Sequence, residues 1–321
     1  MSASASRLGT SREVVRRPRP GADGAFHWTL RGLALAPLAI LIGLGVQLFR
    51  ASAASRHAFG WGFLTNSAWD PVFGHFGAWP FLFGTLLTTA VGVVIAAPLG
   101  VGTAVFLAEL APFWLRAPVG YLVELLAAVP SVVYGLWGIF VLAPWLQQSA
   151  EPWLGDHFSG VPLFQGAPYG VGYLAAGLIL AVMIVPFVVG LSRQAISAVP
   201  AQQREAAYAL GSTRWEVIRR VAVPTARSGI WGGILLATGR ALGETMAVTM
   251  IIGNRPAVSA SLFAPGYTLA SVIANEFTEA TGALYISSLI EIGLVLFAIT
   301  VVVNLVSRLL LSRITRAGAA A

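Results

Sequence analysis

An arginine and a glutamate stand four residues apart inside a long apolar stretch of this sequence. Arg240 and Glu244 both fall within residues 229–252, and residues at this spacing share one face of a helix. Ionisable residues at membrane depth are costly to insert, and they commonly mark the route of a ligand. A guanidinium group binds oxyanions through two parallel hydrogen bonds. Arg240 and Glu244 therefore predict an anion pathway, to which Thr245 and Thr249 add hydroxyl groups.

The chemistry of this pair favours an anion that carries its own proton. Phosphate at neutral pH can accept hydrogen bonds from Arg240 and donate one to Glu244, whereas sulfate has no proton to donate. We also expect a contribution from Glu291, which either lines the same pathway or pairs with Arg240 from a neighbouring helix. Glu124 is a weaker candidate near the inner end of its span. Gly239 and Gly243 form a GxxxG motif, which predicts that another helix packs closely here.

Composition shows which elements must position these residues. The chain has 321 residues, of which 57% are hydrophobic and 10% are charged, whereas a soluble domain has about 25% charged residues. It is therefore predicted to be an all-α polytopic membrane protein, in which a span needs about 20 apolar residues. The six predicted spans are 32–49, 81–108, 119–142, 170–191, 229–252 and 285–310.

The distribution of arginine predicts the orientation of these spans. With the N-terminus inside, 16 Arg residues fall on the inner side and three on the outer side, as the positive-inside rule requires. Both termini are therefore expected in the cytoplasm and the chain in the plasma (inner) membrane. Residues 1–31 are predicted to be an Arg-rich, mostly disordered tail, 32–80 a first span with an outer loop, 81–311 a core of five spans, and 312–321 a second tail.

Two residue types are absent from the sequence. All 20 basic residues are Arg, because the chain contains no Lys, and the phosphate-binding loop of ordinary ATPases needs a Lys. Cys is also absent, which excludes disulfides and thiolate metal sites. We therefore expect no cofactor, no metal and no enzymatic activity. If ATP drives this protein, a separate subunit must hydrolyse it.

A polar loop at residues 193–227 separates two of the predicted spans. Pro200 suits the first turn of a helix, and Gly211 can end that helix in a left-handed conformation. Thr213 and Glu216 have the spacing of a capping box, and Pro224 is expected to end the second helix. Two short helices joined by a glycine form a compact surface that can dock into a soluble partner. The alternative is a helical hairpin that lies in the membrane interface.

This loop resembles the EAA loop of type I (MetI-like) ABC importer permeases. The matching residues are Glu205, Ala206, Ala207 and Gly211, followed by Val221, Val223 and Pro224. The segments 107–112, 128–138 and 239–254 are similar to one of the two permease subunits of phosphate importers. The likeness extends from about residue 81 to residue 311.

The resemblance implies a permease subunit that forms half of a phosphate pore. It implies a second permease, a dimer of ATPase subunits docked on the polar loop, a phosphate-binding protein outside, contact with membrane lipid and no nucleic acid. It also implies that Arg240 and Glu244 help phosphate to pass. Two alternatives remain at this stage: a permease for sulfate, molybdate or phosphonate, and a self-sufficient secondary transporter.

Overall fold

The computed structural model describes residues 20–319, with side chains from 26 to 312, and within this range it is helical with no strand. It forms two units, residues 1–47 and 48–321. Helix α1 (Pro20–Ala51) begins in the first unit. Residues 20–31 are thus helical, which corrects part of the predicted disordered tail. Residues 1–19 of that tail lie outside the described residues.

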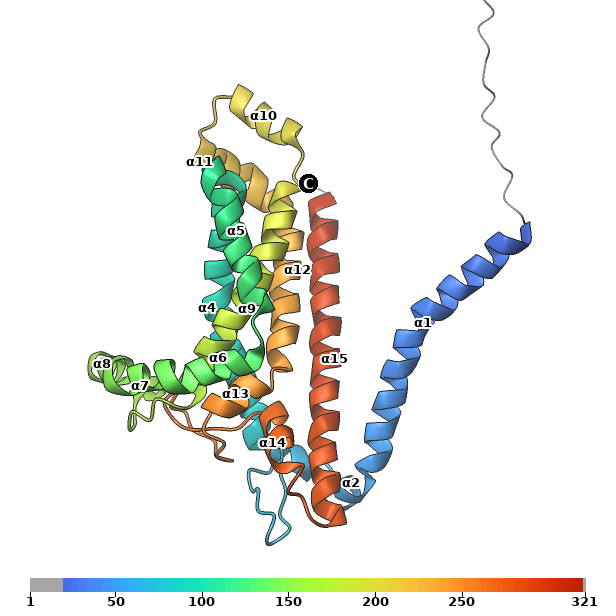
Figure 1. Cartoon of the computed structure of the whole chain (residues 1–321), viewed down its shortest axis with the longest axis vertical. Helices are drawn as coiled ribbons and strands as arrows, with labels where there is room; N and C mark the ends of the chain where they lie inside the picture. Colours follow the sequence, from blue (N-terminus) through green and yellow to red (C-terminus); the bar gives the residue numbers. More distant parts are fainter. Residues whose placement is uncertain (1–19, 320–321) are drawn as a thin grey trace, which may run out of the picture. The chain divides into compact units, whose positions relative to one another are not determined.

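The second unit is built on long helices and contains several shorter ones (Figure 1). The long helices are α4 (Trp79–Val105), α5 (Phe113–Ala128), α9 (Tyr173–Ser197), α12 (Val223–Leu242) and α15 (Ala283–Ala319). The shorter α-helices are α2 (Ala53–Phe59), α3 (Gly62–Thr65), α6 (Ser131–Trp137), α7 (Ala143–Trp145), α8 (Glu151–His157), α10 (Ala201–Ala209), α11 (Arg214–Val217), α13 (Met246–Ile251) and α14 (Leu269–Glu276). The π-turns are η1 (Phe106–Leu110), η2 (Gly138–Leu142), η3 (Leu146–Ala150) and η5 (Ile218–Ala222), and η4 (Pro162–Phe164) is a 3₁₀ turn.

Helices α4, α9 and α12 pack together through glycine. A Cβ atom on Gly177 of α9 would lie 2.5 Å from Val91 of α4, and one on Gly229 of α12 would lie 2.3 Å from the Cβ of Ala195. Such contacts leave no room for a side chain and bring the helix backbones close together. The buried core around Ile179 and Ile184 lies along this contact.

Fewer helices meet the length and hydropathy of a membrane span than the six predicted. Within residues 20–319, four qualify, and a fifth is obtained if a strongly bent pair is counted as one span. The remaining predicted span, 229–252, corresponds to α12, a short non-helical segment and the short α13. At 20 residues α12 is about 30 Å long, but its Arg, Thr, Ser and Gly residues lower its hydropathy. The helical membrane-protein fold is confirmed, although not every span is a continuous helix.

The bent pair corrects the predicted third span, 119–142. Helix α5 ends at Ala128, and the segment 131–157 continues at 93° to it. Val129 is extended (ψ 129°) because a residue that precedes proline, here Pro130, avoids the helical region. The Tyr134 hydroxyl donates to the Leu126 carbonyl at 2.7 Å across the bend, so one carbonyl freed at the end of α5 is satisfied.

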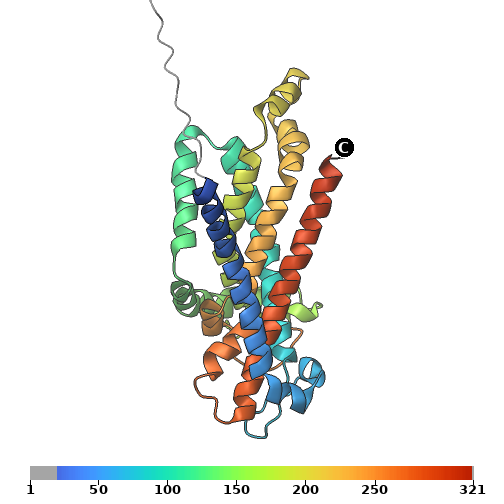
Figure 2. The same ribbon diagram turned by 90° about the vertical axis from the view of Figure 1, so that its right-hand side faces the viewer.

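The polar loop and helices α2, α3 and α14 lie at opposite ends of the second unit (Figures 1 and 2). Both views place α10, α11 and the C-terminal end of α15 at one end, which we call the polar-loop end (Figures 1 and 2). Helices α2, α3 and α14 lie at the other end, which we call the α2 end. There an aromatic cluster that includes Trp69, Phe76, Phe81 and Tyr285 surrounds the carboxylate of Glu276.

Candidate functional site

The two short helices of the polar loop follow the signals in the sequence. Helix α10 begins directly after Pro200, and Gly211 has a φ of +84°, the left-handed conformation predicted for it. The Glu216 amide donates to the Thr213 hydroxyl at 3.4 Å, and the Thr213 amide donates to the Glu216 carboxylate at 2.9 Å. The capping box is therefore confirmed. Hydrogen bonds from the Thr213 backbone and hydroxyl lower the pKa of the Glu216 carboxyl.

The outer surface of this loop is accessible in the isolated chain. Glu205 and Ala206 are exposed, and Ala207 is half-buried. Leu210 and Trp215 expose 88% and 61% of their surface. Large apolar side chains displayed on a short polar element are typical of a protein-binding surface. Trp215 is thus exposed, whereas Ile218 and Ala222, which follow it along the chain, are buried.

Pro224 does not end the second helix, contrary to the prediction. Helix α11 runs through the π-turn η5 into α12, and Pro224 lies in the first turn of α12. Proline has no N–H to donate, and its ring crowds the carbonyl of the preceding turn. The wider π-turn immediately before Pro224 absorbs this change, so the chain stays helical. Helix α11 of the polar loop is thus joined to α12 by continuous helix.

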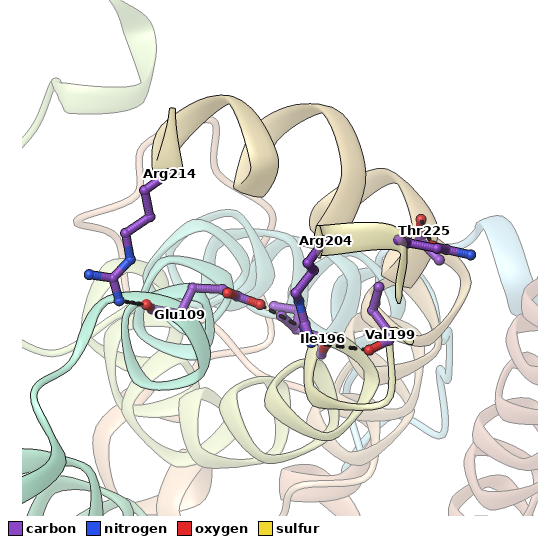
Figure 3. Close-up of polar contacts among 7 residues, drawn as sticks. Glu109, Ile196, Val199, Arg204, Arg214 and Thr225 are labelled. Carbon is purple, nitrogen blue, oxygen red and sulfur yellow. Dashed lines mark hydrogen bonds and ion pairs between the residues drawn. The ribbon is translucent and has the colours of Figure 1, made fainter. Parts of the chain in front are cut away.

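An ion pair that sequence reasoning missed fastens the loop to the end of α4 (Figure 3). The Arg204 guanidinium binds the Glu109 carboxylate at 2.8 Å and also donates to the carbonyls of Ile196 and Val199. The side chain of Arg214 donates to the Glu109 carbonyl. Glu109 belongs to a segment singled out for its family likeness, but nothing local in the sequence connects it with position 204.

Arg240 and Glu244 are not on one continuous helix face, and they form no ion pair among the described residues. Helix α12 ends at Leu242, and α13 begins only at Met246. This break at Gly243 removes the i,i+4 geometry on which the predicted pairing depended. The Glu244 carboxylate instead accepts the amide of Ala247 at 3.4 Å. The predicted shared helix face is therefore wrong, because Arg240 lies in the last turn of α12 and Glu244 lies between α12 and α13.

The surroundings of Arg240 leave its charge available. Its guanidinium carbon lies 4.7 Å from the centre of the Phe187 ring, within the range of a cation–π interaction. The side chain is exposed in the isolated chain. The Thr245 hydroxyl donates to the Gly243 carbonyl at 3.2 Å, and the Thr249 hydroxyl donates to the Thr245 carbonyl at 2.8 Å. Both hydroxyl oxygens keep lone pairs that can accept a hydrogen bond.

The remaining predicted carboxylates lie in other surroundings. Glu291 is buried on α15 and faces Arg56 of α2, not Arg240, so its predicted pairing with Arg240 is wrong. Glu124 is exposed on α5 and lines an open cavity with Arg116 and Arg193. No group of three or more His, Asp or Glu residues in the described part of the chain has the arrangement of a metal site.

The predicted GxxxG motif at Gly239 and Gly243 is not where helices approach most closely. A Cβ on Gly239 would lie 3.8 Å from the Asn304 side chain, which is an ordinary contact. Gly243 lies just after the end of α12. The tight packing uses Gly229 and Gly233, a second pair at the same spacing, against α9. This pair was visible in the sequence but was overlooked.

Comparison with known proteins gives this arrangement a family. Residues 96–316 match the family described as binding-protein-dependent transport system inner membrane component. The phosphate transport system permease protein PstC of Mesorhizobium japonicum is 48% identical over 315 residues, which cover 97% of this chain and 96% of that protein. The chain belongs to the PstC family of binding-protein-dependent transport permeases. PstC of Pasteurella multocida is 47% identical and covers 91% of this chain and 92% of its own.

Solved structures support the same fold for this PstC-family permease. A chain of the bacterial alginate ABC transporter, solved with an alginate-bound periplasmic protein, matches with a TM-score of 0.61. It covers 93% of this chain and 99% of its own at 16% sequence identity. A chain of the MetNI methionine ABC transporter in an inward-facing conformation matches with a TM-score of 0.51, 19% identity and 74% and 94% coverage. At these identities the likeness concerns the fold alone.

Proposed function

We propose that this chain is the transmembrane permease subunit of an ATP-driven phosphate importer and forms half of its translocation pore. The observation that carries the proposal is the 48% identity, across 97% of the chain, to a phosphate transport system permease. The exposed guanidinium of Arg240 adds chemistry that suits a phosphate anion.

Arg240 and Glu244 are proposed to contact the passing phosphate together with Thr245 and Thr249. The Arg240 guanidinium donates two hydrogen bonds to phosphate oxygens, and the Glu244 carboxylate accepts a hydrogen bond from the protonated oxygen of the anion. Because the helix break separates Arg240 from Glu244, the site has two states. In one state both side chains are free to receive phosphate, and in the other a phosphate bridges them. Sulfate lacks the proton, so it leaves the carboxylate facing a like charge.

The polar loop is proposed to couple this pore to a separate ATPase. Its contact residues are Glu205, Ala206, Ala207 and Gly211, with Pro224 at the junction to α12. Because η5 joins α11 to α12 without a helical break, a push on the loop moves the helix that carries Arg240. This chain has no Lys for a phosphate-binding loop, so ATP hydrolysis is assigned to the partner.

The proposed complex contains a PstA-like second permease, a dimer of PstB-like ATPase subunits and a PstS-like phosphate-binding protein. The excess of Arg on one side of the spans favours cytoplasmic N- and C-termini. This orientation puts the polar loop on the ATP side and the α2 end toward the binding protein.

Uptake by a reconstituted complex tests the proposal. The chain is co-expressed with the neighbouring transport genes, purified and placed in lipid vesicles with labelled phosphate. We expect uptake that requires ATP and the binding protein and that excess sulfate does not inhibit. Uptake without any ATPase, or equal inhibition by sulfate and phosphate, contradicts the proposal.

A further inference from the structure

A cavity at the α2 end lies apart from Arg240 and from the polar loop. Its volume is 510 Å³, and α2, α3 and α15 supply most of its wall. The lining residues include Phe49, Arg56, Leu64, Glu291, Leu294 and Ala298. One acidic and one basic side chain thus face an otherwise mostly apolar space.

Glu291 is the most unusual residue in this wall. Its side chain is 6% exposed, and its Oε2 atom has no hydrogen-bond partner among the described residues. Ser55 of α2 lies beside the carboxyl group, but no described group donates a hydrogen bond to Oε2. A buried carboxylate oxygen is stable only when a donor satisfies it. The cavity therefore has room, and a chemical need, for a group that carries N–H or O–H donors.

The cavity wall is held in place by hydrogen bonds between α2 and α15. The Ser55 amide donates to the Ser287 hydroxyl at 3.1 Å, and the Ser288 hydroxyl donates to the Ser55 hydroxyl at 3.1 Å. Both bonds are buried. Because they join positions more than 230 residues apart in sequence, they fix the distance between α2 and Glu291.

Arg56 presents a positive charge beside this carboxylate without neutralising it. Its Nε donates to the Ser52 hydroxyl at 3.1 Å, and its Nη2 donates to the Phe49 carbonyl at 2.6 Å. The guanidinium carbon also lies 3.6 Å from the centre of the Phe49 ring. These contacts orient the guanidinium and leave Nη1 for another acceptor. No ion pair joins Arg56 and Glu291 in the described part of the chain.

We propose that this cavity binds a phospholipid whose headgroup carries both an ammonium with N–H donors and a phosphate, the phosphatidylethanolamine class. After the buried carboxyl group rotates toward the cavity, the ammonium donates to Oε2 of Glu291, and the phosphate accepts from Nη1 of Arg56. An acyl chain packs along Leu294, Val295 and Ala298, one apolar stripe of α15. Trp61, 88% exposed at the rim, suits the polar–apolar boundary of a bilayer.

The same chemistry excludes other common lipids. Phosphatidylcholine has a similar charge distribution, but its quaternary ammonium has no N–H to satisfy Oε2. Phosphatidylglycerol has hydroxyl donors, but its net negative charge is repelled by the Glu291 carboxylate. Water alone occupies about 30 Å³ per molecule and leaves the apolar part of the wall without a partner.

Lipid retention measures this selectivity directly. The full chain, in complex with its partner subunits, is equilibrated with vesicles that hold equal parts of phosphatidylethanolamine, phosphatidylcholine and phosphatidylglycerol. Retained lipids are then counted by native mass spectrometry. We expect at least about tenfold enrichment of phosphatidylethanolamine over phosphatidylcholine, the size of one hydrogen bond to a charged group.

Four variants locate the effect. Glu291→Gln keeps the shape of the side chain and removes its charge, so it is expected to reduce the enrichment to less than about twofold. Arg56→Gln is expected to lower the retention of every phospholipid at this site. Exposed Glu279→Gln and Arg50→Gln are matched controls that should leave the enrichment unchanged.

Several results would overturn the proposal. They are equal retention of the three lipids by the wild-type complex, an unchanged enrichment in Glu291→Gln, or an equal loss in the Glu279→Gln control. The wild-type measurement alone decides if a variant fails to assemble. Because no transport is measured, the result is independent of the transported substrate.

Discussion

Arg204 binds Glu109 at 2.8 Å across 95 positions of sequence, whereas Arg240 and Glu244 form no ion pair in the described structure despite lying four positions apart. The first arginine also satisfies two backbone carbonyls at the end of α9. The second lies against the Phe187 ring. A charged group whose hydrogen bonds are made within the protein stabilises the fold. A charged group without such bonds is available to bind a ligand.

Removal of the Arg240 charge should have the largest effect on phosphate uptake. We expect Arg240→Gln to lower phosphate uptake by about 10- to 100-fold, because a hydrogen bond to a charged group contributes about 1.5–3 kcal/mol. Uptake by reconstituted vesicles measures this loss, with subunit assembly checked in parallel. Arg308→Gln, at an exposed position of α15, is the control. Uptake within about twofold of wild type, with normal assembly, would show that Arg240 does not contact phosphate.

Reversal of the Arg204 charge should have the next largest effect, on ATPase association. Arg204→Glu places two carboxylates together and removes the donors to the Ile196 and Val199 carbonyls. We expect ATPase association to fall about tenfold, since charged hydrogen bonds of this kind contribute about 1.5–3 kcal/mol. The measurement is the amount of ATPase that co-purifies with the chain.

A charge swap distinguishes the ion pair from the loop's total charge. Arg204→Glu combined with Glu109→Arg restores the pair but not the carbonyl contacts, so association should recover in part. Arg219→Glu, at an exposed position in the same loop, changes the charge equally without touching the pair. If the swap recovers nothing, the pair is not what positions the loop.

A substitution at the helix break should turn the separated charges of Arg240 and Glu244 into an ion pair. Gly243 has a φ of −94°, which alanine adopts without strain, and alanine favours helix by about 1 kcal/mol over glycine. Gly243→Ala should extend α12 toward Glu244, bring the two charges together and lower uptake by about fivefold. Gly102→Ala, in open space on α4, is the control. Increased uptake in Gly243→Ala would contradict the role given to the free charges.

The smallest effect is expected at the capping box. Thr213→Val removes a cap that contributes about 1 kcal/mol, which hydrogen exchange in α11 can measure. The pKa of Glu216 is lowered in the folded chain by the bonds from Thr213. This contribution is therefore present above the unfolded pKa and is lost as the pH falls through the folded pKa. A difference between wild type and variant that grows toward acid pH would contradict this assignment.

The sequence predicts local features of this molecule better than its distant contacts. Pro200, Gly211 and Thr213 act on their immediate neighbours, so the ends of α10 and α11 could be predicted. The bend at Pro130 and the break at Gly243 depart from the predicted spans, because apolar composition does not distinguish one unbroken helix from two shorter ones. Both positions carried a warning, since proline and glycine interrupt helices.

The family resemblance reached the overall architecture, while contacts between distant segments remained hidden. Arg204 and Glu109 meet only because α9 and α4 pack side by side, and Glu291 meets Arg56 only because α2 folds against α15. No periodicity in the sequence of these segments predicts either contact. A second chain or an alignment would be needed to detect them before the fold is known.

The π-turn η5 limits how the chain length between the docking surface and α12 can change. Each residue of an α-helix turns the chain by about 100°, and a π-turn holds one residue more in its hydrogen-bonded ring. Deletion of one residue within Ile218–Ala222 would let the turn relax to ordinary α-helix and leave α11 close to its present rotation about the α12 axis, whereas insertion of one residue would rotate α11 by about 100°. Substitutions and a single deletion in η5 should therefore be tolerated better than an insertion, because an added residue changes the rotational phase between α11 and α12.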